Sequence, residues 1–173
     1  MPNYRRNRVP GGTYFFTVNL LDRSSDRLTE EIDALREAVR AALARAPFHI
    51  DAWVVLPDHM HCIWTLPNFA GRWKAIRTAF SKATPKTERR SSVMLHRGER
   101  GVWQHRYWEH TIRDDRDYAA HVAYVHFNPV RHGLVETPAD WTFSSFHGWV
   151  AKGLYRPDWM GGDDEPTEAG ERD

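Results

Sequence analysis

The sequence contains a single cysteine, only four lysines and no run of 18 or more apolar residues. The lone cysteine, Cys62, excludes an intrachain disulfide and any metal site built from paired thiolates. The absence of a long apolar run excludes a membrane-spanning helix, and no apolar segment follows the early basic residues as a signal peptide requires. We therefore expect a cytoplasmic protein that makes no contact with a membrane.

Positive charge dominates most of the chain, although the formal net charge is only +1. Seven of the 23 acidic residues lie after position 157, so residues 1–157 carry a net charge of +7. Of the 24 basic residues 20 are arginines, whose planar guanidinium groups suit phosphate contacts and stacking on bases. Eight tryptophans add surfaces on which unpaired bases stack. The composition favours a nucleic-acid partner, while solvated arginines and core tryptophans are the alternative.

Strand-forming segments and helical periodicities follow one another in the order β-α-β-β-α-β-α. The predicted strands are 14–19, 48–56, 59–66 and 103–112. The predicted helices run from Leu28 to just before Pro47, from Phe69 to just before Pro85, and from Asp114 or Asp115 to about Phe127. This order predicts an α+β fold, a ferredoxin-like or RRM-like antiparallel sheet with helices packed on one face.

The chain is long enough for one compact core, and we assign residues 1–159 to a single domain. Polar and basic residues from Lys82 to Arg100 predict a mobile loop, and residues 130–159 are expected to wrap back onto the domain. The glycine- and acid-rich positions 160–173 offer little apolar surface for a core, so we expect a disordered tail there.

Two histidines alternate in the segment LPDHMHC at 56–62. Side chains alternate along a strand, so His59 and His61 point to the same face, about 7 Å apart, and can converge on one divalent ion. The alternative is a pair of imidazoles on the solvated face of a half-buried strand. Asp58 either orients one imidazole from behind or only forms the turn. Two ligands leave a metal site incomplete, so a third donor is needed.

The third predicted helix carries the other polar groups of interest. Its apolar stripe consists of Tyr118, Val122 and Val125, and we assign Tyr118 to the core. On a helical wheel Tyr124 lies about 120° from that stripe, so it is not obviously a core residue. Asn128 follows four residues later, which places its side chain over the same helix face. The helix therefore pairs a hydroxyl nucleophile with an oxygen ligand.

Three segments carry a family resemblance: LPDHMHC at 56–62, ERGVWQHRYWEHTIR at 99–113 and YVHFNPVRHGLV at 124–135. Together they resemble the HUH single-tyrosine transposases and, more narrowly, the REP-associated tyrosine transposases, where REP denotes a repetitive extragenic palindrome. The likeness runs from Met1 to about Trp159. Asn128 departs from the glutamine that related insertion-sequence enzymes usually have there, and agrees with the REP-associated branch.

The resemblance implies a reaction and a set of roles. His59, His61 and Asn128 would bind a divalent cation, Mg or Mn, although imidazole ligands alone also suit Zn or Ni. Tyr124 would attack a phosphodiester of single-stranded DNA, giving a covalent 5′-phosphotyrosine and a free 3′-hydroxyl. The substrate would be a hairpin of a repetitive extragenic palindrome, cut and rejoined in the bacterial nucleoid. A tyrosine with an ordinary pKa of about 10 needs the nearby cation to react.

Several basic and polar residues are candidate DNA contacts, with solvated charge or ordinary packing as the alternative. The candidates are Arg5, Arg6, Arg8, Lys86, Arg89, Arg90, Ser144, Ser145 and His147. Two further histidines, His121 and His126, flank the tyrosine on its helix and serve either packing or proton transfer.

Two other functions are compatible with the same residues. A hairpin-binding regulator would keep the scaffold without cutting DNA, and a zinc-dependent hydrolase built on His59 and His61 would not need Tyr124. The number of subunits, and whether the tyrosine works with its own chain's metal or a partner's, stay open at this point.

Overall fold

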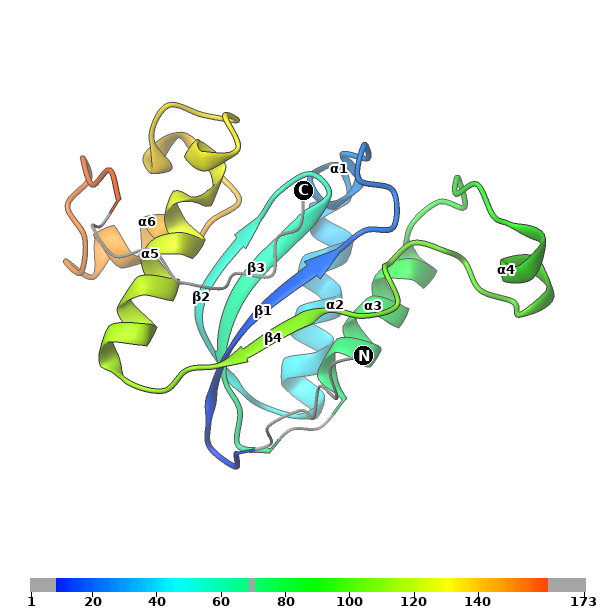
Figure 1. Ribbon diagram of the computed structural model, residues 1–173, viewed down its shortest axis with the longest axis horizontal. Coiled ribbons are helices and arrows are strands. Elements are labelled where there is room, and N and C mark those ends of the chain that lie inside the picture. Colours follow the sequence, from blue (N-terminus) through cyan, green and yellow to red (C-terminus); the bar gives the residue numbers. More distant parts are fainter. Residues whose placement is uncertain (1–8, 69–70, 162–173) are drawn as a thin grey trace, which may run out of the picture.

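The computed structural model describes residues 9–68 and 71–161 (Figure 1). The predicted contacts at Arg5, Arg6 and Arg8, the predicted helix start at Phe69 and most of the acidic tail lie outside these ranges. Four strands form one antiparallel sheet in the spatial order β2-β3-β1-β4, which confirms the predicted sheet. They are β1 (Thr13–Asn19), β2 (His49–Val55), β3 (His59–Thr65) and β4 (Trp108–Thr111).

One face of the sheet is covered by two helices, α2 and α3, as predicted (Figure 1). The first three helices of the chain are α1 (Arg27–Glu30), α2 (Ile32–Arg45) and α3 (Arg72–Ala83). The first predicted helix is divided into α1 and α2, because the backbone at Glu31 (φ −105°, ψ 34°) leaves helical geometry. Alternate residues of the central strands point into this layer, where Phe16 and Cys62 are fully buried.

The opposite face is covered by α5 (Asp115–Arg131), a layer that the prediction did not include (Figure 1). Phe15 of β1 and Ile63 of β3 pack there against Val125 of the helix. The central strands are therefore enclosed on both faces, which explains why β3 is buried from its first residue to its sixth.

Helix α5 begins as predicted and ends later than predicted. The Asp114 carboxylate accepts a hydrogen bond from the backbone N–H of Asp117 at 2.8 Å, an N-cap contact. The expected end at Asn128-Pro129 is wrong, because Pro129 lies within the last turns, where its missing N–H costs the helix a single hydrogen bond. Gly133 then takes a left-handed conformation (φ +67°), and the N–H of Leu134 donates to the Pro129 carbonyl at 2.9 Å. This is a Schellman ending.

Residues 84–107, which we call the excursion, connect α3 to β4, and the part that contains the helix α4 projects away from the sheet (Figure 1). The predicted strand 103–112 is shortened to β4. Trp103 makes only an isolated bridge to Leu20, because its indole turns into the core and packs against Phe80 at 5.2 Å between ring centroids.

The predicted mobile loop within the excursion contains α4 (Ser92–His96) and is held to the domain. Glu88 forms ion pairs with Arg27 and Arg100, and its carboxylate is largely buried. Arg100 also donates from Nη1 to the Thr84 carbonyl at 3.1 Å. These contacts fix the base of the excursion.

The chain beyond α5 returns to the β2 edge of the sheet, as expected. It contains the 3-10 turn η1 (Pro138–Asp140) and α6 (Phe146–Ala151). Trp141 and Trp149 each donate an indole N–H to a β2 carbonyl, that of Val55 at 2.9 Å and that of Asp51 at 3.0 Å. Within the described ranges, no helix is long and apolar enough to cross a membrane.

Candidate functional site

The two histidines of β3 lie side by side beneath α5. Their ring centroids are 5.0 Å apart, and their exposed fractions are 2% for His59 and 0% for His61. Alternation places both on one face of the sheet, as predicted. The alternative of a solvated histidine face is wrong, because α5 covers it. The imidazoles are therefore held in a largely dehydrated position.

Each imidazole is oriented through its Nδ1 atom. His59 Nδ1 lies 2.7 Å from Asp58 Oδ1, and His61 Nδ1 lies 2.8 Å from the hydroxyl oxygen of Thr17 on β1. Asp58 is itself paired with Arg23, whose Nε is 2.6 Å from Oδ2. Partners of this kind fix the tautomer and the direction of an imidazole. With Nδ1 engaged, Nε2 is the ring nitrogen that each histidine would use to coordinate a metal.

Burial acts to raise the pKa of Asp58, but its hydrogen bond to His59 and the charges of His59 and Arg23 outweigh burial. The pKa of Asp58 therefore lies below its ordinary value, and the carboxylate is ionised at neutral pH. Arg23 in the loop after β1 and Asp58 in the turn before β3 thus together position His59.

The phenol of Tyr124 meets these histidines from the helix side. Its ring centroid is 5.3 Å from that of His61, with the rings nearly perpendicular. The guanidinium carbon of Arg131 lies 5.5 Å from the centre of the Tyr124 ring. Tyr124 is 7% exposed, so it belongs to the core, which its position on the helical wheel does not indicate. Its ring packs against Phe15 as well as His61, because this face of α5 lies on the sheet.

Asn128 is fully buried on α5, one turn after Tyr124. The helix continues past it, so the predicted four-residue spacing places both side chains along the same face. His132 follows one turn later and packs its ring against His59 at 5.0 Å. Sequence reasoning missed His132, although its spacing from Asn128 repeats the same step of four.

The predicted DNA contacts fall into two groups in the structure. Lys86, Arg89 and Arg90 are exposed on the excursion, on the side of the sheet away from α5 (Figure 1). Ser144 instead forms an isolated bridge to Val54 of β2, and its Oγ accepts a local hydrogen bond from the Phe146 N–H at 3.1 Å.

Ser145 Oγ accepts from the backbone N–H of Trp53 at 2.9 Å and lies 2.8 Å from His126 Nε2. The exposed His147 contacts the Trp141 carbonyl through Nε2 at 3.2 Å. The contact of Ser145 with Trp53 holds the C-terminal segment on β2, whereas the side-chain contacts of Ser144 and His147 lie within that segment.

His126 has a packing role rather than a proton-transfer role. Its ring is fully buried among aromatic side chains, including Trp149 at 5.3 Å and Tyr155 at 5.4 Å between centroids. Burial lowers the pKa of His126 from 6.5 to about 3, so the ring stays neutral. Tyr118, the competing tyrosine, is half-buried and donates its hydroxyl to Asp51 at 3.2 Å, and burial followed by that carboxylate raises its pKa.

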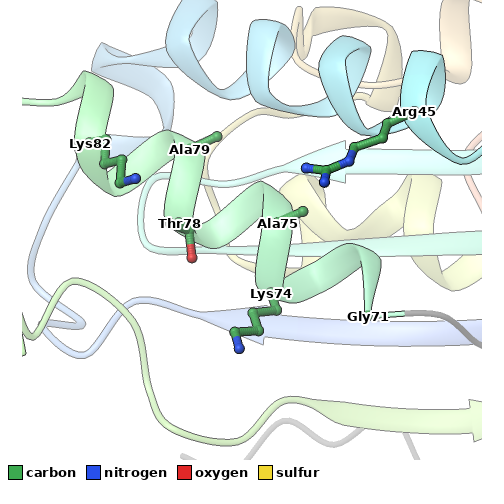
Figure 2. Close-up of a pocket in the computed structure, with 7 residues that line it drawn as sticks. All are labelled: Arg45, Gly71, Lys74, Ala75, Thr78, Ala79 and Lys82. Atoms are coloured by element: carbon green, nitrogen blue, oxygen red, sulfur yellow. The ribbon is translucent and has the colours of Figure 1, made fainter.

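Two further features were not predicted. His110, Asp117 and His121 bring potential metal-ligand atoms together where β4 meets α5. A groove of about 410 Å³ between α2 and α3 is lined by Arg45, Lys74 and Lys82, with no acidic residue in its lining (Figure 2). The groove lies in the helical layer opposite α5 and shares no residue with the histidine and tyrosine cluster.

Comparison with known proteins was made by sequence and by structure. No family model matches the chain. A REP-associated tyrosine transposase of Escherichia coli (strain K12) is 47% identical over 176 aligned positions, covering 99% of this chain and 98% of that protein. The chain belongs to the REP-associated tyrosine transposases. A Haemophilus influenzae relative bearing the same family name is 43% identical over 169 positions, covering 95% of this chain and 96% of that protein.

A solved REP-associated tyrosine transposase, described as bound to a REP hairpin, has the same fold, with a TM-score of 0.83 and 46% sequence identity. The match covers 99% of this chain and 98% of that one. Both the family resemblance drawn from three short segments and the predicted fold are therefore confirmed.

Proposed function

We propose that this chain is a metal-dependent endonuclease and strand transferase for single-stranded DNA, with Tyr124 as nucleophile. Its substrate would be a DNA hairpin of a repetitive extragenic palindrome, at work in the bacterial nucleoid. The observation that carries the proposal is the packing of the Tyr124 ring against His61, 5.3 Å away, in a chain of this family. A phenol placed beside two oriented imidazoles is the arrangement that a metal-assisted tyrosine nucleophile needs.

The residues present fit a divalent cation. His59, His61 and Asn128 would supply two imidazole nitrogens and a carboxamide oxygen, ligand types that Mn²⁺ accepts and that waters complete for Mg²⁺. Both imidazoles are held through Nδ1 by Asp58 and Thr17, the support that ligating histidines usually have. When bound, the cation supplies positive charge that favours a phenolate and stabilises negative charge on the phosphate.

The chain's own residues then perform a transesterification. The Tyr124 oxygen attacks the phosphorus and forms a new P–O bond, losing its proton to water. The bond from phosphorus to the 3′ oxygen breaks, and that oxygen takes up a proton to leave a free 3′-hydroxyl. Because one phosphoester replaces another, a second 3′-hydroxyl can reverse the step without ATP. Arg131 places a positive charge over the Tyr124 ring and would favour its ionised form.

Hairpin recognition would rest on basic surface. Lys86, Arg89 and Arg90 of the excursion are exposed and suited to phosphate contacts. The arginines at 5, 6 and 8 are proposed as contacts from the sequence alone. The related solved structure, described as bound to a REP hairpin, supports this class of substrate.

The decisive experiment measures a covalent protein–DNA adduct. A single-stranded oligonucleotide carrying an inverted repeat from the DNA flanking the gene is incubated with Mg²⁺ or Mn²⁺, and the products are separated under denaturing conditions. Adduct is expected with the native protein and is expected to be lost in Tyr124→Phe. Tyr118→Phe, the same change six residues earlier on α5, is the matched control and should retain it.

Two results would replace the proposal with another function. Hairpin binding without adduct in any divalent metal would identify a non-cleaving regulator. Undiminished cleavage by Tyr124→Phe would identify a metal-dependent hydrolase that does not use the phenol.

A further inference from the structure

A second group of potential metal ligands joins β4 to the first turns of α5. His110 Nε2 lies 2.8 Å from Asp117 Oδ2, and His121 Nδ1 lies 3.1 Å from Asp117 Oδ1. The two imidazoles are stacked with 4.6 Å between centroids and 14° between their planes. His121 is 2% exposed, and the other two side chains are mostly buried. The two oxygens of the Asp117 carboxylate thus each face a nitrogen of one of the two stacked rings.

We propose that His110, Asp117 and His121 form a second divalent-cation site, of the kind that takes Zn²⁺, Co²⁺ or Mn²⁺, and that the bound ion fastens α5 to β4. Two imidazoles with one carboxylate are a frequent protein ligand set for these metals, with water as the fourth ligand. Metal bonds of 2.0–2.1 Å at tetrahedral angles place ligand atoms about 3.3 Å apart. The two carboxylate–imidazole separations are shorter than this by a few tenths of an ångström, and all three ligand atoms lie within 4.8 Å of one another, so side-chain movements would bring them to this spacing.

This site would be independent of the one proposed at His59 and His61. The Phe15 ring stands between them, stacked on His61 at 5.6 Å and tilted against His121 at 4.8 Å between centroids. The two sites share no ligand. Phe15 therefore contacts one histidine of each site. An ion bound by His110, Asp117 and His121 would stabilise the packing of α5 on the sheet, on which the site at His59 and His61 depends.

The charges around the second site allow a cation to enter. Burial acts to raise the pKa of Asp117, but hydrogen bonds from His110 and the Arg113 backbone outweigh it, and the pKa lies below its ordinary value. The carboxylate is therefore ionised at neutral pH. The Arg113 side chain, with Nε 3.4 Å from Asp117 Oδ2, opposes a cation, but it is 69% exposed and can turn into solvent. His121 Nδ1 also contacts the Asp117 carbonyl at 2.8 Å, a contact that coordination through Nδ1 would replace.

The test measures metal binding to the full-length protein without DNA, so its result does not depend on cleavage. In a His59→Ala, His61→Ala background, which removes the first proposed site, calorimetric titration with Zn²⁺ should show one equivalent and a raised melting temperature. Adding His110→Gln should weaken that binding at least tenfold, and so should Asp117→Asn. The matched control is His105→Gln, which makes the same change at an exposed histidine shortly before β4. It should have no effect on Zn²⁺ binding.

Cobalt provides an independent signature, because the visible absorption of bound Co²⁺ reports its ligands. The spectrum of the double-alanine background should change when His110→Gln is added. Absence of a bound equivalent in that background, or equal binding in the His110→Gln protein, would overturn the proposal and leave the cluster as a hydrogen-bonded network alone. Failure of the native protein to form an adduct, with this equivalent still bound in the double-alanine background, would instead count against the Tyr124 proposal alone.

Discussion

Replacing Asp58 by alanine should raise the metal concentration that DNA cleavage requires without changing hairpin binding. The carboxylate lies 2.7 Å from His59 Nδ1 and 2.6 Å from Arg23 Nε, and its side chain is 16% exposed, so water restores these contacts poorly. Loss of a partner that orients a ligating histidine typically lowers metal affinity by about 10- to 100-fold. That range corresponds to about 1.4–2.7 kcal/mol of metal-binding free energy.

The assay is the rate of adduct formation against the concentration of Mn²⁺, measured well below the melting temperature of each variant. The half-saturating metal concentration should rise by the same 10- to 100-fold, while the rate at saturating metal stays within a few-fold of the native value. Asp22→Asn is the matched control, because Asp22 is an acidic residue of the adjoining loop whose carboxylate accepts hydrogen bonds from Ser24. An unchanged metal requirement in Asp58→Ala would refute the assignment of His59 as an oriented ligand.

Three further predictions concern the nucleophile, the helix end and the excursion. Arg131→Ala should slow adduct formation on the order of tenfold with hairpin affinity unchanged, because a charge beside the phenol is lost; equal rates would contradict this. Gly133→Ala should cost roughly 1 kcal/mol in unfolding free energy, since φ is +67° with no neighbour within 4 Å, whereas Gly148→Ala should not. Glu88→Gln should lower the melting temperature at pH 7 but much less at pH 3. Burial acts to raise the pKa of Glu88, but Arg27 and Arg100 outweigh burial and hold this pKa below 4.5. The stability that ionised Glu88 contributes is therefore lost as the pH falls through its pKa in the folded protein. A melting-temperature difference that is the same at both pH values would refute this.

The order of elements and the histidine and tyrosine positions could be predicted because they depend on local patterns. Alternation fixed the shared face of His59 and His61, and the spacing of four fixed Asn128 relative to Tyr124. Burial of Tyr124 could not be predicted, because it depends on α5 packing against Phe15 and His61 on the face of the sheet opposite α2 and α3. Local periodicity does not indicate on which face of a sheet a helix lies.

Other differences have local causes that sequence rules describe too coarsely. Proline usually marks a helix end, yet Pro129 is tolerated in the last turns because only one hydrogen bond is lost. Asp117 and His121 stand four residues apart on the predicted helix, a visible signal for a shared site. The third member of that cluster, His110, comes from β4, and its approach depends on the tertiary fold.

Because α5 is continuous from Asp115 to Arg131, the Tyr124 phenol and the Asn128 carboxamide are carried by one rigid helix. Their separation is set by four residues of helical rise, about 6 Å, and neither can be adjusted without the other. Inserting one residue between them would swing Asn128 by about 100° around the helix and remove it from the pair, however well the protein folded. Only the short connection ahead of Asp114 can vary the height of both over the sheet, so we expect tuning of this centre by evolution or design to be concentrated in that connection.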